Sequence, residues 1–157
     1  MTAGDEWALH CCVVLTFAEE PVPAARLAQV HDVSPSYLAK QLQALSRAGI
    51  VRSTQGTAGG YVLTRSPARI TVLDVVEALD GPGPAFVCTE IRQRGPLAVP
   101  PHAYTVPCPI SRAMAAAETA WRDALRSKSI ADLAQDIDSG GLLGISTWLR
   151  KSGTERF

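Results

Sequence analysis

Two cysteines in the second half of the sequence have the residue types and setting needed to bind a metal. Cys88 lies in an irregular stretch, and Cys108 opens the sequence CPIS at the expected N-terminus of a helix. The positive end of a helix dipole lowers the pKa of a thiol, so this position favours the thiolate that binds metals. In a chain expected to be cytoplasmic, thiols or metal ligands are favoured over a disulfide framework.

A glutamate and a histidine four residues apart interrupt the apolar stretch EWALHCCVVLTFA. Glu6 and His10 would share one helical face, as the ligands of helical metal sites do. The same two residues could instead form a helical side-chain pair, which is worth roughly 0.2–0.5 kcal/mol. Cys11 and Cys12 belong to the apolar part of this helix and are expected to be small core residues.

The N-terminal half contains the elements that must position these side chains. Ser34 and Thr71 are expected N-caps, and Gly49 and Gly81 are expected helix stops. Asp74 completes a capping box with Thr71. Apolar periodicity and these signals predict helices at residues 4–19, 23–31, 34–49 and 71–81, with strands at 50–55 and 60–65.

The C-terminal half is expected to combine an irregular segment with a long helix. Six prolines between Pro82 and Pro107 argue against regular structure there. A stripe of alanines in the expected helix 109–127 favours pairing with a second copy in a homodimer. The predicted fold is mainly α with a small β-hairpin wing, and its parts are a winged helix-turn-helix domain (1–81), a sensor loop (82–108), a dimerisation helix with a short terminal helix (109–138) and a poorly specified tail (139–157).

The distribution of charge indicates where a polyanion would bind. Residues 1–20 carry four acidic side chains and no Lys or Arg, whereas residues 21–70 carry six basic side chains against Asp32 alone. The second segment therefore has a net charge of +5 and is the expected binding region for double-stranded DNA. Each of its polar residues could also belong to an ordinary solvated face.

A helix that follows a tight turn can present polar side chains to the major groove, while a wing reaches phosphates or the minor groove. This layout is typical of a winged helix-turn-helix protein. Arg52 and Arg65 would flank the wing. The residues expected to bind DNA are Ser34, Ser36, Tyr37, Lys40, Gln41, Arg52, Gln55, Thr57, Gly59 and Tyr61.

Several other classes of protein are excluded by the same sequence. It has no apolar run of the roughly 18 residues that span a bilayer and no signal-peptide pattern, so neither a membrane partner nor export is expected. The stretch GTAGG lacks the Gly-Lys-Ser/Thr spacing of a phosphate loop and precedes a strand. No catalytic triad or carboxylate pair is apparent, so neither an enzyme nor a small-molecule substrate is expected.

Two long stretches resemble a known family. SPSYLAKQLQALSRAGIVRSTQGTAGGYVLTR, followed by ITVLDVVEALDG, is similar to the Rrf-two family of bacterial winged-helix transcription regulators. The resemblance spans roughly residues 6–137. It implies a homodimer and a sensing site before the long helix, often an iron–sulfur cluster. EWALHCCVVLT and FVCTEIRQRGPLA resemble the redox-sensing RsrR-type branch. Gln55 stands where family wings commonly carry arginine, so an operator preference does not transfer.

Cluster-binding members of the family usually have three closely spaced cysteines before the long helix, but this chain has Cys88 and Cys108 alone. A 2Fe-2S cluster needs four protein ligands, and imidazole is an established replacement for thiolate. We therefore hypothesise a cluster at the dimer interface, held by these two cysteines of one protomer and by Glu6 and His10 of the other.

Some assignments around this hypothetical cluster remain open. His102 is the reserve fourth ligand, and Trp7, next to Glu6, is a candidate for redox coupling or for gating the site. The alternative is a cluster-free regulator of the same family. It would use Cys88 and Cys108 as a thiol-disulfide switch or as a site of covalent modification.

Overall fold

Helix α1 (Ala3–Thr16) begins at a capping box and is buried along most of its length. Thr2 is its N-cap and Asp5 is the reciprocal partner. Cys11 and Cys12 are fully buried, as expected for core residues. This computed structural model describes residues 2–56, 59–98, 100–103 and 105–154. The chain divides into two compact units, a first unit of residues 1–81 with 125–157 and a second unit of residues 82–124.

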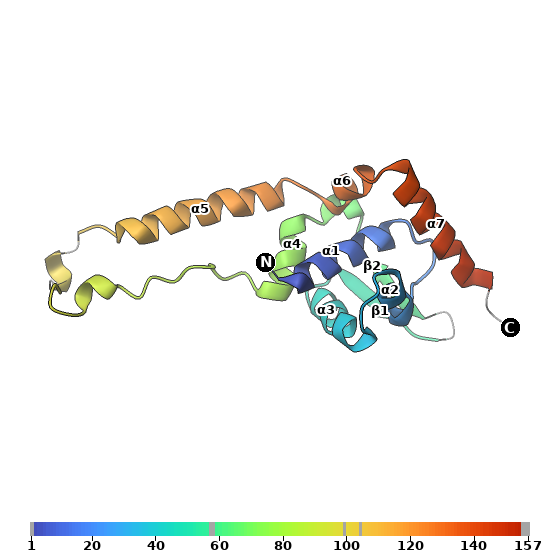
Figure 1. The fold of residues 1–157 in the computed structure, drawn as a ribbon, viewed down its shortest axis with the longest axis horizontal. Coiled ribbons are helices and arrows are strands. Elements are labelled where there is room, and N and C mark those ends of the chain that lie inside the picture. The colour runs from blue at the N-terminus through green and yellow to red at the C-terminus, as the bar shows by residue number, and fades with distance from the viewer. Residues whose placement is uncertain (1, 57–58, 99, 104, 155–157) are drawn as a thin grey trace. The chain divides into compact units, whose positions relative to one another are not determined.

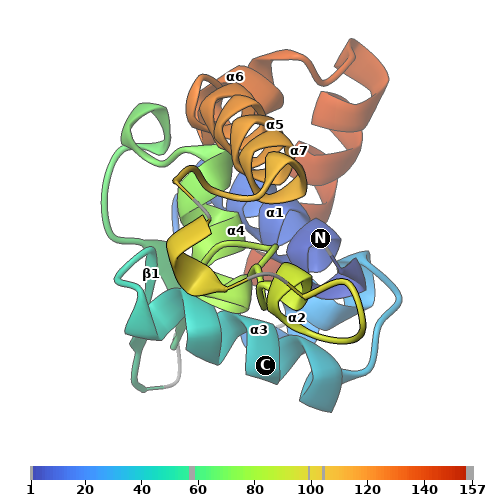
Figure 2. The same cartoon turned by 90° about the vertical axis from the view of Figure 1, so that its left-hand side faces the viewer.

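The next two helices form the helix-turn-helix of the first unit. Helix α2 (Ala24–Val30) is followed by a turn and by α3 (Pro35–Arg47), which packs on α1 and α4 (Figures 1 and 2). The Ser34 hydroxyl accepts a hydrogen bond from the Tyr37 amide at 3.1 Å and caps α3. Gly49, with φ of 68°, adopts the left-handed conformation that ends a helix. The predicted cap and stop are both confirmed.

A two-stranded antiparallel hairpin follows α3. Strand β1 (Val51–Thr54) pairs with β2 (Gly60–Leu63) so that Val51 lies opposite Leu63. The start of β2 passes very close to the chain before α2. Only glycine fits at position 60, because a Cβ there would lie 2.4 Å from the Val22 carbonyl carbon. Two backbone hydrogen bonds between Val22 and Tyr61, of 2.8 and 3.1 Å, fix this approach.

Helices α4 (Val72–Asp80) and α6 (Ile130–Gln135) join distant parts of the chain within the first unit. A 3-10 turn (Pro67–Arg69) precedes α4, whose predicted capping box between Thr71 and Asp74 is present. The Val72 amide donates to the Lys128 carbonyl at 2.8 Å, next to an isolated bridge between Thr71 and Ser129. The chain after the long helix thereby returns to the DNA-binding fold.

Large aliphatic side chains from most of these elements form the core of the first unit. The fully buried ones stabilise it by roughly 1.5–3 kcal/mol each, and they are Leu27, Leu38, Leu42, Leu45, Ile50, Ile70 and Ile130. The structure is mainly helical with a two-stranded antiparallel hairpin, as predicted from the sequence.

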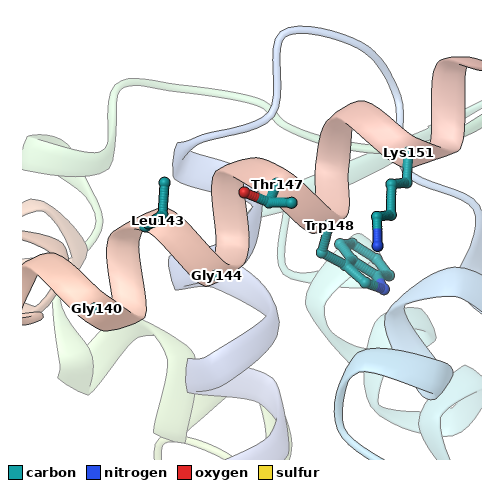
Figure 3. A pocket seen from close by; sticks show the side chains of 6 residues that line it. All are labelled: Gly140, Leu143, Gly144, Thr147, Trp148 and Lys151. Atoms are coloured by element: carbon teal, nitrogen blue, oxygen red, sulfur yellow. The ribbon is translucent and has the colours of Figure 1, made fainter.

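The C-terminal residues form a further helix, α7 (Ser139–Thr154), where the sequence specified no structure. The Arg26 guanidinium of α2 lies 4.4 Å from the indole centroid of Trp148 and donates to the Trp148 carbonyl at 3.2 Å. Gly140, Leu143, Gly144, Thr147 and Lys151 line a shallow depression with Trp148 (Figure 3). Trp148 and Leu149 both pack against the core, so α7 is docked on the first unit.

The second unit consists of an extended segment beside a long helix, α5 (Pro109–Arg126), which continues for two residues past the unit (Figure 1). Two short 3-10 turns, Ile91–Gln93 and Pro101–Ala103, interrupt the segment. The Arg122 guanidinium donates to the Pro82 carbonyl, and the Glu118 carboxylate accepts from the Ala85 amide, both at 3.1 Å. Of the helices in the described residues, none is both long and apolar enough to span a membrane.

Candidate metal centre and DNA-binding surface

Cys88 and Cys108 meet in the second unit, although 20 positions separate them in the sequence. The ligand atoms of Cys88, Glu90 and Cys108 all lie within 4.8 Å of one another. A hydrogen bond from Arg122 to the Pro82 carbonyl and one from the Ala85 amide to Glu118 hold the beginning of this segment along α5, the helix that Cys108 precedes. The local fold therefore brings together two thiols and one carboxylate.

Cys108 has the surroundings of a reactive or metal-binding thiol. Its side chain is buried, and its carbonyl accepts the Arg112 amide of the first turn of α5 at 2.9 Å. A hydrogen bond from the Ser111 backbone holds the pKa of the Cys108 thiol below its ordinary value, with help from the Ile110 backbone and from the charge of Arg92. These groups favour the thiolate, as the sequence predicted for a helix N-terminus.

Glu90 is the member of this group that sequence reasoning missed. It has φ of 50° and ψ of 52°, a left-handed conformation that non-glycine residues rarely adopt. Arg92 forms an ion pair with both carboxylate oxygens, one contact being 2.8 Å from the guanidinium Nη2 to Oε2. The hydrogen bond from Arg92 lowers the pKa of the Glu90 carboxyl. The only signal in the sequence was the spacing of Cys88 and Glu90 two positions apart.

The other two proposed ligands lie on α1, in the first unit. Glu6 and His10 are both exposed, so the face that they share is open in this chain. Within the described residues no ion pair joins them. The helical side-chain pair stays the alternative to a role as ligands. Their position next to a partner protomer remains a prediction. His102 is exposed in the 3-10 turn of the second unit.

Trp7 links this face of α1 to the helix-turn-helix. Its half-buried side chain packs against the core, and its ring centroid lies 5.8 Å from that of His31, the C-cap of α2. The His10 ring lies 5.5 Å from the same imidazole. Burial of His31, followed by the charge of His10, lowers the pKa of His31. A displacement of this part of α1 would therefore reach the turn that leads to α3.

Cys11 and Cys12 are unsuited to the same chemistry. Burial raises the pKa of Cys11 to about 12, and burial together with the charge of Cys11 raises the pKa of Cys12 still further. Both thiols are therefore held in the protonated form, which is a poor metal ligand. The cysteines of the second unit, Cys88 and Cys108, remain the candidates for metal binding.

The outer face of α3 carries most of the side chains expected at a DNA groove. Ser36, Tyr37 and Lys40 are exposed. Ser34 is exposed too, but its hydroxyl is used in capping α3. Gln41 differs from the expectation, because it is 9% exposed and its Oε1 lies 3.1 Å from the point that a Cβ on Gly4 would occupy. Gln41 thus belongs to the packing between α3 and α1.

The hairpin presents a smaller set of candidates. Arg52 and Gln55 are exposed, whereas Tyr61 is half-buried against the core. Gly59 accepts no side chain, since a Cβ there would lie 2.6 Å from the Thr54 carbonyl oxygen. Arg65 pairs with Asp74 at 3.2 Å. Thr57, also expected to bind DNA, lies outside the described residues.

Comparison with known proteins identifies the family. Residues 1–136 match the Rrf2 family, described as an iron-dependent transcriptional regulator. YwgB of Bacillus subtilis is 33% identical over 134 residues, which are 83% of this chain and 81% of that protein. The HTH-type transcriptional regulator IscR of Xenorhabdus nematophila is 40% identical over 68 residues, 43% of this chain and 42% of its own.

Similarity of the fold to a solved structure supports the same family. The structure of CymR, titled the global cysteine regulator of B. subtilis, superposes with a TM-score of 0.69 at 26% identity. The alignment covers 88% of this chain and 98% of CymR. The chain belongs to the Rrf2 family of DNA-binding transcriptional regulators, which are not enzymes.

Proposed function

We propose that this regulator is a cytoplasmic homodimer of the RsrR-type branch that senses redox state through a 2Fe-2S cluster. Cys88 and Cys108 of one protomer would hold the cluster together with Glu6 and His10 of the other. The observation that carries the proposal is the approach of the Cys88 and Cys108 ligand atoms to within 4.8 Å of each other, with Cys108 favoured as thiolate. The description of the Rrf2 family as iron-dependent is consistent with the proposed cluster.

The donor set fits such a group. A bound 2Fe-2S cluster would supply a centre that gains or loses one electron, and its four ligands require two groups beyond the cysteines. Glu6 and His10 are exposed on one face of α1 and can reach a ligand outside their own protomer. Exposed apolar residues on α5, Ile110 at 61% and Met114 at 42%, are consistent with burial in a dimer.

Contacts of Trp7 connect the proposed ligands on α1 with the helix-turn-helix. Trp7 adjoins Glu6, packs against the core and lies beside His31 at the end of α2. A change in how Glu6 and His10 are held would bias the position of α1 and of the turn before α3. Two states of this turn, populated differently in the two redox states, would alter the affinity for the operator.

Anaerobic purification followed by absorbance, iron and sulfide analysis tests the cluster. We expect about two irons and two sulfides per cluster, and a changed spectrum in Glu6→Ala and His10→Ala. Glu19→Ala, at an exposed carboxylate, serves as the control with an unchanged spectrum expected, and His102→Ala tests the reserve ligand and should also leave the spectrum unchanged. A colourless, iron-free protein after reconstitution would overturn the cluster, whereas unchanged spectra in both Glu6 and His10 variants would overturn the ligand assignment.

DNA binding by the α3 face is tested separately with a duplex that the wild-type protein selects from a random library. Lys40 is exposed on α3, so Lys40→Ala should weaken binding and reduce its dependence on salt concentration. Lys128→Ala removes the same charge from the chain between α5 and α6 and is the matched control. Equal titrations for the Lys40 variant and wild type would remove this lysine from the contact surface.

A thiol-disulfide switch is the second candidate function, favoured by the same distance between the two thiols. Oxidation would join Cys88 to Cys108 in one chain, with loss of two hydrogen atoms to an added oxidant such as diamide. Mass spectrometry of the intact protein would detect the bond. Cys88→Ser should abolish the mass change, and a change that persists in this variant would exclude the pair.

A further inference from the structure

We infer that Cys88, Glu90 and Cys108 of one protomer form a site for a single divalent ion of the Zn²⁺ or Fe²⁺ type, with a fourth position open to water. This site shares Cys88 and Cys108 with the cluster proposed above, so one protomer holds either group and not both. It differs from the cluster because it uses neither Glu6 nor His10 and needs no second protomer. Its three ligand atoms lie within 4.8 Å of one another in the second unit.

The distances between the three ligand atoms are slightly longer than those around a bound zinc ion. Zinc binds thiolate sulfur at about 2.3 Å and carboxylate oxygen at about 2.0–2.2 Å in tetrahedral sites, so neighbouring ligand atoms are then separated by roughly 3.5–3.8 Å. The present group therefore has to contract by roughly 1 Å to enclose an ion. Three protein ligands with an open fourth position are a common arrangement for zinc.

The chemistry of the donors selects the class of ion. Two thiolates favour zinc and ferrous iron, whereas magnesium and calcium prefer oxygen ligands alone. Glu90 completes the set as a negatively charged oxygen donor. The presence of two thiols also distinguishes this group from the exposed clusters of acidic residues that many protein surfaces carry without a metal.

Arg92 positions Glu90 for this role. Its guanidinium contacts both oxygens of the carboxylate, which fixes the plane of the group. A carboxylate can accept about four hydrogen bonds, so lone pairs remain for an ion after Arg92 has bound. Hydrogen bonds of this kind to ligating carboxylates are typical of metal sites.

The backbone shows how the ligands are held together. Glu90 adopts a left-handed conformation that costs free energy in a non-glycine residue and directs the chain into the turn Ile91–Gln93. The Gln93 amide closes this turn on the Glu90 carbonyl at 3.0 Å. Strained residues of this type cluster at ligand-binding sites, and here the strained residue is itself a candidate ligand.

Cobalt titration of the reduced, metal-free full-length protein under anaerobic conditions tests the site. Co²⁺ replaces zinc in tetrahedral sites, and thiolate ligands give it strong near-ultraviolet charge-transfer bands. We expect one Co²⁺ per protomer with such bands. Cys11 and Cys12 should not compete, because burial keeps both thiols protonated.

Four variants separate this site from the cluster. Glu90→Gln keeps the size of the side chain and should raise the dissociation constant for Co²⁺ about 10- to 100-fold while retaining charge-transfer bands. Cys88→Ser and Cys108→Ser should each lose about half of the charge-transfer intensity. Glu20→Gln, an exposed acidic residue in the first unit, is the matched control and should bind as wild type does. Circular dichroism verifies that each variant is folded.

The outcome for Glu6→Ala/His10→Ala distinguishes the two proposals. We expect this double variant to bind Co²⁺ within about twofold of wild type even if it no longer holds a 2Fe-2S cluster. Loss of Co²⁺ binding in it, or unchanged affinity in folded Glu90→Gln, would overturn the one-protomer site. A wild-type protein that binds Co²⁺ but never holds a cluster would overturn the proposed cluster and leave this site in place.

Discussion

The two units of this regulator are stabilised by different means. In the first unit, seven leucine and isoleucine side chains from helices α2, α3 and α6 and from the connections before β1 and α4 are fully buried. Among the described residues of the second unit, Cys108 is the only apolar side chain that is buried, and Leu97 is 90% exposed. The second unit is held instead by hydrogen bonds and ion pairs, such as those that Arg122 and Glu118 form with each other and with the backbone.

This difference would suit the sensor that we propose. A unit with a hydrophobic core resists opening, because opening it exposes apolar area to water. A unit without such a core would gain more of its stability from a bound metal or a partner chain. The chemistry of Cys88, Glu90 and Cys108 lies in the unit whose own packing is weak.

The largest expected effect is on the dissociation constant of the dimer. Substitutions on the apolar face of α5 test whether a second chain covers this face. Replacing Ile110 and Met114 together by glutamate would place four carboxylates in the interface of a dimer, where desolvation and repulsion oppose association. We expect the dissociation constant to rise at least about 1,000-fold, roughly 4 kcal/mol, as measured by analytical ultracentrifugation. Thr119→Glu, on the opposite face of α5, should leave the dimer intact; identical sedimentation of all three proteins would contradict the proposed interface.

A pair of leucine substitutions tests the contrast in packing. Leu42 is fully buried in the first unit, and Leu42→Ala should lower the free energy of unfolding by about 2–5 kcal/mol because it leaves a cavity. Leu97→Ala, in the second unit, removes an exposed side chain and should change it by less than about 0.5 kcal/mol. Urea denaturation followed by circular dichroism measures both, and similar losses in the two variants would refute the comparison.

The docking of α7 should contribute less than the central core. Trp148→Ala removes the stacking on Arg26 and part of the packing against the core, for an expected loss of about 1–2 kcal/mol. Leu143, on the same helix, is 65% exposed, so Leu143→Ala provides the control with little change. The same urea titrations apply, and a larger loss from Leu143→Ala than from Trp148→Ala would show that α7 docks differently.

The smallest expected effect is a dependence of stability on pH confined to the first unit. Burial lowers the pKa of His31 in the folded state, whereas the unfolded value is about 6.5. The unfolded chain then binds more protons, so this contribution to stability is complete above about pH 6.5 and is lost as the pH falls through the folded pKa. His31→Gln should reduce the loss of stability between pH 7.5 and 5.5. His102→Gln should leave it unchanged, and an unreduced loss in the His31 variant would assign the effect to other groups.

Local signals in the sequence predicted most of the DNA-binding unit. Ser34 caps α3, Thr71 and Asp74 form the capping box of α4, and Gly49 ends a helix, because each depends on the backbone within a few residues. The same local reasoning did not predict the packing of Gln41. Helical spacing placed this residue near the DNA face, but its side chain lies against Gly4. Helix α7 was missed because its glycines and serines conceal a helix that packs through Trp148.

The sequence by itself determined the kind of molecule: a winged helix-turn-helix regulator with two candidate metal-binding thiols and an unusual Glu6–His10 pair on its first helix. Only the tertiary structure decided that Cys88 and Cys108 meet, and that Glu90 and Arg92 lie with them. Residue types and helix signals are local properties of a chain. The approach of groups 20 positions apart depends on how the sensor segment returns along α5 and on the left-handed turn at Glu90.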